Sequence, residues 1–179
     1  MIITLVGYRG CGKSSVGPAL AARLSWDAAD ADTEIERRSG LTIRDIFREQ
    51  GEPAFRRIER EVISELLAGR NVVLAAGGGA VLNAETRREM TSAGPVVWLQ
   101  ASVETILERI EADSSSGARR PSLTESDPRT EVESLLAVRE PLYREVATLA
   151  VATDGRAVQE IVDEIIARLP PPDREEPAG

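Results

Sequence analysis

The 179-residue chain contains no histidine, which excludes His-based catalytic triads, His metal sites and a His general base. Its one cysteine, Cys11, excludes an internal disulfide and any zinc site built from several cysteines. Aromatic residues make up only 3% of the chain, so aliphatic side chains must form the core. Any acid–base chemistry therefore falls to a carboxylate, a tyrosine or Lys13, which is the only lysine.

The chain also lacks an excess of positive charge and lacks long apolar runs. The net charge of −8 argues against general nucleic-acid binding. The N-terminus lacks a basic region followed by a long apolar stretch, and the sequence has no apolar run long enough to cross a bilayer. We therefore expect a cytoplasmic protein that does not bind membranes. The length suits one domain, expected over residues 1–170, followed by a flexible proline-rich tail at 171–179.

The lone lysine lies in the segment Gly7–Ser14, whose spacing is that of the phosphate-binding loop, Gly-x-x-x-x-Gly-Lys-Ser. Glycines let the backbone fold round a phosphate chain and direct its N–H groups inward. Lys13 is a compact charge on a long stem that can reach the β- and γ-phosphates, and the Ser14 hydroxyl can ligate Mg²⁺. The sequence predicts binding of a nucleoside triphosphate, the alternative being a glycine-rich turn with a surface lysine.

The residues on either side of this loop favour phosphate binding. Residues 2–6 are β-branched and uncharged, which is typical of a buried parallel strand. Residues 15–24 have apolar side chains at helical spacing, and Pro18 should then lie in the first helical turn, where its missing N–H does no harm. The loop would thus join a strand to a helix N-terminus, where backbone donors and the helix dipole favour an anion.

Beyond this unit, apolar runs alternate with helical patterns. Strands are expected near 26–30, 71–75, 95–99 and 149–152, and helices near 32–39, 43–68 with a break at 51–53, 83–92, 102–112, 129–145 and 156–168. Such alternation predicts an α/β protein, a three-layer α/β/α sandwich with helices on both faces of a parallel sheet. Ligands in such folds bind at the carboxyl ends of the strands.

Two of the next three groups of residues follow strands, where that edge is expected, and the third lies on a helix. Asp30 and Asp32 follow the second strand and suit a Mg²⁺ site or a general base, although Asp32 also suits a helix N-cap. Arg56 and Arg57 lie on a helix, where paired arginines usually form a solvated face. Gly77–Gly79 follow a buried strand and would let a small ligand meet backbone N–H groups, the alternative being a flexible turn.

Residues 111–128 interrupt the alternation, because they are polar, rich in Ser, Gly and Pro, and too numerous for an ordinary connection. A disordered surface insertion would explain this composition. Together with a phosphate-binding loop, however, the segment predicts a mobile lid that brings Arg119 or Arg120 over the phosphates, since phosphoryl transfer benefits from water exclusion and an added cation.

The chain resembles the shikimate kinase family over nearly its full length. The motifs that carry the resemblance occur in that family's order: Gly7–Ser14, Asp30–Asp32, Gly51–Glu59, Gly77–Gly79 and Arg139–Tyr143. Each later motif is weak alone, but the ordered set is highly specific. The chain departs from the commonest pattern at Ala31 and Ser15, where the family frequently has threonine.

The resemblance implies a P-loop kinase with a five-stranded parallel sheet in the order 2-3-1-4-5. It implies ATP-dependent phosphorylation of the 3-hydroxyl of shikimate by a monomer, with a substrate-binding region at about 32–61. Implied substrate contacts are Asp32, Arg56, Gly78 and Arg139; implied Mg²⁺ contacts are Ser14 and, through water, Asp30. Implied ATP contacts are Gly10, Cys11, Gly12, Lys13, Ser14, Ser15, Arg120 and Arg156, with Lys13, Asp32 and Arg120 as the catalytic residues.

Two alternatives remain at this point. A kinase for another small hydroxy acid, such as gluconate, would share the loop and the lid without needing Arg56, Gly78 and Arg139 together. A nucleotide-dependent regulatory switch would bind ATP or GTP and have no acceptor pocket.

Overall fold

Five parallel strands form the sheet in a computed structural model that describes residues 1–112 and 127–169. The strands are β1 (Ile2–Val6), β2 (Asp27–Asp30), β3 (Val72–Ala75), β4 (Val96–Gln100) and β5 (Leu149–Ala152). Their order is β2-β3-β1-β4-β5, which confirms the predicted topology. Each predicted strand matches an observed one to within about a residue at either end, because short apolar runs between turn residues leave little freedom in placement.

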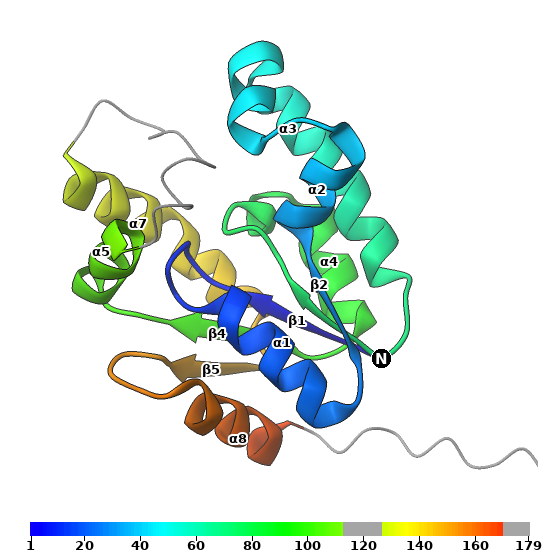
Figure 1. Ribbon diagram of the computed structural model, residues 1–179, viewed down its shortest axis with the longest axis vertical. Coiled ribbons are helices and arrows are strands. Elements are labelled where there is room, and N and C mark those ends of the chain that lie inside the picture. The colour runs from blue at the N-terminus through cyan, green and yellow to red at the C-terminus, as the bar shows by residue number, and fades with distance from the viewer. Residues whose placement is uncertain (113–126, 170–179) are drawn as a thin grey trace, which may run out of the picture.

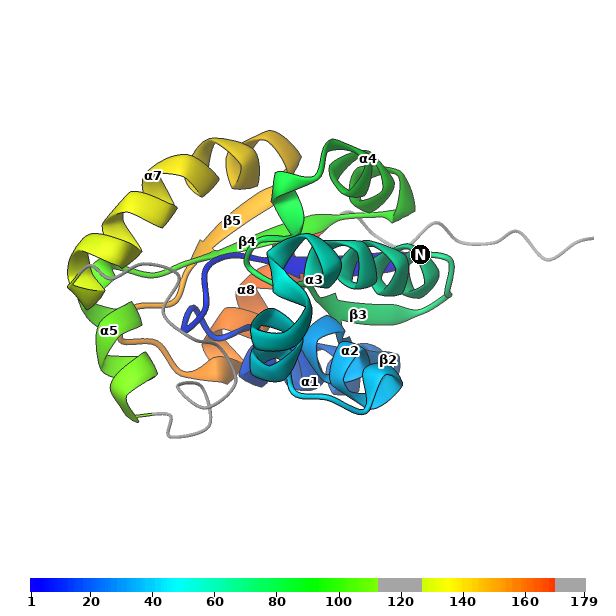
Figure 2. The same ribbon diagram turned by 90° about the horizontal axis from the view of Figure 1, so that it is seen from above.

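Helices cover both faces of the sheet. They are α1 (Lys13–Leu24), α2 (Ala31–Ser39), α3 (Ile43–Leu67), α4 (Ala84–Ala93), α5 (Val103–Ala112), α7 (Pro128–Val146) and α8 (Val158–Arg168), with a 3₁₀ turn η1 (Ala80–Leu82). Helices α4 and α7 lie on one face with part of α3, and α1 and α8 lie on the other (Figures 1 and 2). Helix α2 and the first part of α3 project beyond the sheet (Figure 1).

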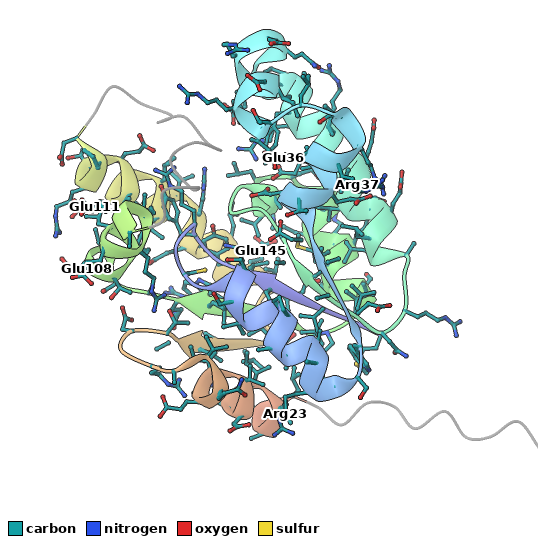
Figure 3. The ribbon with its side chains drawn as sticks, viewed as in Figure 1. Arg23, Glu36, Arg37, Glu108, Glu111 and Glu145 are labelled. Atoms are coloured by element: carbon teal, nitrogen blue, oxygen red, sulfur yellow. The ribbon has the colours of Figure 1, made fainter. Side chains whose placement is uncertain are left out.

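The core is divided by the sheet into two layers. Successive strand residues point to opposite faces, so Ile2 and Val6 pack on the side of α3, α4 and α7, whereas Ile3 and Leu5 pack on the side of α1 and α8. All of β1 is buried, as expected for the central strand of a parallel sheet. Many charged side chains lie on the surface; Arg23 at the end of α1, for example, pairs with an aspartate of α8 at 3.1 Å (Figure 3).

The expected position of Pro18 is wrong. Helix α1 begins at Lys13, so Pro18 lies inside the helix in its second turn rather than in its first. Its missing N–H deprives the Ser14 carbonyl of an ordinary helical partner. The helix begins early because Gly12, with φ of 102°, turns the chain from the loop directly into the helix. The glycine, and not the proline, therefore sets the start of α1.

The suggested capping role of Asp32 is also wrong. Helix α2 begins at Ala31, and its N-cap is Asp30, whose carboxylate accepts a hydrogen bond from the Thr33 N–H at 3.0 Å. Asp32 lies in the first helical turn instead. The carboxylate implied for catalysis is therefore not the one used to cap the helix.

The predicted break in the long helix is confirmed at Gly51. This residue has φ of 79° and ψ of 169° inside α3, so the helix consists of two segments that meet there. Pro53 follows in the first turn of the second segment, where a proline costs no hydrogen bond. The break lets the second segment run across the sheet while the first stands beyond it (Figure 1).

We expect Gly94→Ala to destabilise the fold strongly. Gly94 has φ of 151°, and a Cβ there would lie 2.2 Å from the Ile2 carbonyl oxygen of the central strand. The free energy of unfolding, measured with urea, should fall by about 2–4 kcal/mol. The control is Gly40→Ala, which also has a positive φ, of 67°, but no atom within 4 Å of the added Cβ, and should cost about 1 kcal/mol. Equal losses in the two variants would contradict this account.

Candidate active site

The sheet register brings three loops to one edge. In neighbouring strands Asp30 pairs with Ala75, and Ala75 pairs with Leu5, so β2, β3 and β1 end side by side. The loop after β3 then comes close to the loop after β1, because a Cβ on Gly78 would lie 3.3 Å from the Gly7 carbonyl oxygen. The phosphate-binding loop, the aspartates and the glycine triplet therefore share the carboxyl edge of the sheet, as predicted.

The phosphate-binding loop depends on glycine at three positions. Gly7, Gly10 and Gly12 have φ of 140°, 80° and 102°, conformations that other residues rarely adopt. At Gly7 a Cβ would also lie 2.5 Å from the Leu99 carbonyl oxygen at the end of β4. The loop is thus a tightly packed backbone structure whose residue types are dictated by its shape.

Lys13 is folded into this loop. Its ammonium donates to the Gly7 and Tyr8 carbonyl oxygens at 2.7 and 3.0 Å and lies 3.6 Å from the buried Cys11 Sγ. Ser14, in contrast, is exposed in the first turn of α1, where helix N–H groups and a hydroxyl can face a phosphate and its metal ion. A turn with a surface lysine does not describe this arrangement.

Arg56 points at the glycine triplet. A Cβ on Gly79 would lie 2.5 Å from Arg56 Nη1, so the guanidinium occupies the space that a side chain would need. Glu59, which is buried, accepts from Nη1 at 2.6 Å, and Glu52 accepts from Nε and Nη2 at 3.2 and 3.0 Å. The solvated-face alternative holds for Arg57, which is exposed, but not for Arg56.

Arg139 approaches the same glycines from α7. It is 5% exposed, and its guanidinium lies 5.6 Å from the centre of the Tyr8 ring, in the phosphate-binding loop. A Cβ on Gly78 would lie 3.6 Å from Arg139 Nη1. None of the ion pairs within the described part of the chain includes Arg139, whose guanidinium lies beside the Tyr8 ring and the glycine backbone.

A tyrosine near the end of α7, in the motif Arg139–Tyr143, fixes the backbone of the glycine triplet Gly77–Gly79. Tyr143 is buried and donates from its hydroxyl to the Gly78 carbonyl oxygen at 2.6 Å. Burial raises the pKa of Tyr143, so the hydroxyl keeps its proton and remains a donor. With the Gly78 carbonyl oxygen held in this way, the peptide is fixed between the two arginines.

The residues implied for magnesium fit a sparsely ligated Mg²⁺ ion. Asp30 uses one carboxylate oxygen to cap α2, which leaves the other for a metal-bound water, and the Ser14 hydroxyl is exposed. In the segments 1–112 and 127–169, no three acidic or cysteine side chains form a metal cluster. Mg²⁺ in phosphoryl-transfer sites commonly has one or two protein ligands, with phosphate and water supplying the rest, so a hydroxyl and one carboxylate are donors of a suitable kind and number.

Arg109 is a residue that sequence reasoning missed. It lies on α5, and its Nη1 donates to the Gly10 carbonyl oxygen at 3.1 Å and to Thr153 Oγ1 at 3.0 Å, while Nη2 donates to the Thr153 carbonyl at 2.8 Å. It thereby links the phosphate-binding loop to the loop after β5. Its only signal in the sequence is its place near the end of a helix, where arginine is common for other reasons.

In its described part, the structure does not show the other arginines implied for ATP in contact with the phosphate-binding loop. Arg156 follows β5 at the same edge, but its donors bond to the Ala152 and Glu160 carbonyl oxygens and to Glu164 of α8, so its role at ATP stays a prediction. Arg119 and Arg120, with most of the expected lid, lie outside the described residues, as does the tail.

Comparisons with known proteins agree with this geometry. The family described as shikimate kinase matches residues 9–170. A shikimate kinase of Francisella tularensis subsp. holarctica is 47% identical over 164 residues, covering 91% of each chain. A solved structure of the shikimate kinase from Acinetobacter baumannii in complex with shikimate has a TM-score of 0.87 and 40% identity, covering 92% of this chain and 90% of that one.

The chain belongs to the shikimate kinase family. It is therefore an ATP-dependent kinase that acts on a small molecule, as the sequence predicts. A gluconokinase from Sinorhizobium meliloti matches with a TM-score of 0.58 and 23% identity over 93% of this chain, which reflects the shared fold alone. Neither a gluconate kinase nor a nucleotide switch is favoured over membership of the shikimate kinase family.

We expect Gly79→Ala to impair the acceptor site without unfolding the protein. Gly79 has φ of −99° and ψ of −3°, which alanine adopts easily, but the new Cβ would displace the Arg56 guanidinium. The KM for shikimate should rise about tenfold, equivalent to ~1.4 kcal/mol, while the KM for ATP stays unchanged. Steady-state titration of each substrate measures the two KM values, and urea unfolding checks that the variant is as stable as the parent protein. An unchanged KM for shikimate would show that Arg56 does not need this position.

Proposed function

We propose that the chain transfers the γ-phosphoryl group of ATP to the 3-hydroxyl of shikimate, forming shikimate 3-phosphate and ADP. The observation that carries this proposal is the convergence of Arg56 and Arg139 on Gly78 and Gly79, beside the phosphate-binding loop. Two guanidiniums around a backbone with no side chains suit a small carboxylate, because arginine pairs with carboxylates through parallel hydrogen bonds.

In this proposal the carboxylate of shikimate lies between Arg139 and Arg56, and Gly78 contributes its backbone. Asp32, in the first turn of α2 at the end of β2, orients the 3-hydroxyl and accepts its proton as the phosphoryl group is transferred. The carboxylate anchors one end of the substrate, and the aspartate holds the other. Under this division of roles, recognition requires both an acid and a hydroxyl on the substrate.

The nucleotide occupies the phosphate-binding loop. Backbone N–H groups of Gly10, Gly12 and Ser14 are proposed to meet the phosphates from the loop and the start of α1. The N–H groups of Cys11 and Ser15 donate to the Tyr8 and Gly12 carbonyl oxygens at 3.2 and 3.1 Å in the structure, so their proposed contacts with ATP require these bonds to be exchanged. Lys13 exchanges its two carbonyl contacts for the β- and γ-phosphate oxygens. Arg120 is proposed to close over the γ-phosphoryl group and Arg156 to lie on the adenine side. Most of the rate enhancement then comes from positioning and charge stabilisation.

Mg²⁺ is proposed to bind at the Ser14 hydroxyl and, through water, at Asp30. When bound, the ion supplies positive charge that offsets the phosphate oxygens during transfer. Asp30 can take this part while capping α2, because a carboxylate has two oxygens and the cap uses one.

We further propose that the protein acts as a monomer in the cytoplasm. In the described part of the chain, no helix combines the length and the apolar character needed to cross a membrane. The two large apolar side chains exposed there, Leu82 and Val138, lie on η1 and α7 respectively, which is the scattered exposure typical of a monomer surface.

Lys13→Met should abolish phosphoryl transfer with little effect on stability. The loop is held by backbone geometry, whereas the ammonium acts on phosphate charge. Its removal should therefore raise the activation free energy of transfer by roughly 3–4 kcal/mol. Turnover is measured by coupled ADP release and folding by urea unfolding. Since Lys13 is the only lysine, an amine-directed reagent should label it and the N-terminus, and ATP should protect it. Labelling that saturating ATP leaves unchanged would argue against the proposed nucleotide site.

Arg139→Ala and Asp32→Asn should fail in different ways. Arg139→Ala removes a charge-assisted contact far from the reacting bond, so the KM for shikimate should rise by one to two decades, or ~1.5–3 kcal/mol. Asp32→Asn keeps the size of the side chain but loses its charge, so kcat should fall even at saturating shikimate. The KM for ATP should change little in either variant.

Gluconate serves as the control acceptor for both variants and for the parent protein. It presents a carboxylate and hydroxyls on an open chain, so it should be a poor substrate throughout. Faster turnover of gluconate than of shikimate by the parent protein would leave only a generic P-loop kinase.

A further inference from the structure

Two glutamates and the Gly79 backbone occupy the edges of the Arg56 guanidinium. Glu59 accepts from Nη1, Glu52 accepts from Nε and Nη2, and the outer end of the group lies against Gly79. A carboxylate pairs with arginine through two N–H groups at once. An incoming carboxylate can therefore form such a pair only if one glutamate gives up its contacts.

Glu52 is the partner that gives way more easily. The Glu59 side chain is 4% exposed and its bond to Arg56 is 2.6 Å long, so removing it would leave a charge buried in the protein. The Glu52 side chain is 53% exposed, and a single oxygen accepts both of its longer bonds, at 3.0 and 3.2 Å. Exposed ion pairs of this kind contribute little to stability and are easily exchanged for water.

The surroundings leave room for this exchange. A cavity of about 430 Å³ between α3, η1 and α4 is lined by both Glu52 and Arg56, with Leu82 and Thr86 on the opposite wall. Glu52 lies next to Gly51, where the backbone of α3 leaves helical geometry. The side chain therefore has open space beside it and can move away from Arg56 without displacing packed atoms.

We propose that Glu52 is a displaceable stand-in for the carboxylate of the substrate: it satisfies the Nε and Nη2 donors of Arg56 in the empty site and yields them when an acid binds. The inference rests on the proposed function in taking shikimate as that acid. Glu52 then lowers the affinity of the site for every carboxylate by the same factor, because each must first displace it. Neutral ligands that make no pair with Arg56 are unaffected.

The test is Glu52→Gln, which removes the charge and keeps the size of the side chain. The KM for shikimate should fall about threefold to sixfold, the factor expected when a weak exposed ion pair no longer competes. The kcat and the KM for ATP should stay unchanged. Binding of cyclohexanecarboxylate, followed by calorimetry without nucleotide, should tighten by the same factor, whereas binding of shikimate methyl ester should not change.

The matched control is Glu49→Gln. Glu49 lies on the other side of the break in α3, its side chain is 50% exposed, and it pairs with Arg48 at 2.8 Å instead of with Arg56. This variant makes the same change in net charge, so it should leave both carboxylate affinities as in the parent. An equal gain in both variants would mean that only long-range charge is involved and would overturn the stand-in role.

A higher KM for shikimate in Glu52→Gln would also overturn the proposal. It would mean that Glu52 helps substrate binding by orienting Arg56, instead of competing with the substrate for it. No change would overturn it as well. If the parent protein fails to phosphorylate shikimate, the proposed function falls. The ratio of cyclohexanecarboxylate affinities in parent and Glu52→Gln still decides the role of Glu52 in that case.

Discussion

The active site depends on a close approach of backbones that side chains would prevent. A Cβ on Gly7 would lie 2.5 Å from the Leu99 carbonyl oxygen, and a Cβ on Gly78 would lie 3.3 Å from the Gly7 carbonyl oxygen. The segments at the ends of β1, β3 and β4 therefore lie side by side, with no side chain between their backbones at these points. This contact brings the glycine triplet next to the phosphate-binding loop, and the space that Gly79 leaves open is filled by the Arg56 guanidinium. The distance between the two substrate sites is thus set by the absence of side chains.

The two arginines at this edge differ in how their charges are balanced. Arg56 is paired with two glutamates, so much of its charge is already neutralised. Arg139 is more deeply buried and lies over the Tyr8 ring, which attracts a cation less strongly than a carboxylate does. A buried guanidinium with no carboxylate partner in the described part of the chain gains most from an anionic ligand. Arg139 should therefore supply most of the attraction for the acid, while Arg56 supplies geometry and selectivity.

Local patterns predicted most of the fold, and long-range contacts account for what they missed. The strands, the break at Gly51 and the phosphate-binding loop follow from neighbouring residues and were predicted correctly. The role of Arg109 cannot be predicted from neighbouring residues, because its partners lie 99 and 44 residues away, on other loops. Pro18 lies one turn later in the helix than predicted, because Gly12 starts the helix at Lys13, five residues before the proline. The residues of the acceptor site stay a prediction that rests on an ordered set of family motifs. Which side of Arg56 each glutamate occupies depends on packing that no motif encodes.

The presence of lysine at position 13, in a chain whose other basic side chains are all arginine, is explained by the shape of the loop. Its interior is narrow: the ammonium lies between the Gly7 and Tyr8 carbonyl oxygens at 2.7 and 3.0 Å and close to the buried Cys11 Sγ. A guanidinium is planar and wider, and its donors are fixed in a fork, so it cannot turn between two carbonyls and a phosphate. At the proposed acceptor site the requirement is reversed, because that fork matches the two oxygens of a carboxylate. One chain thus uses lysine where a point charge must move within a backbone ring, and arginine where a flat anion must be held in one orientation.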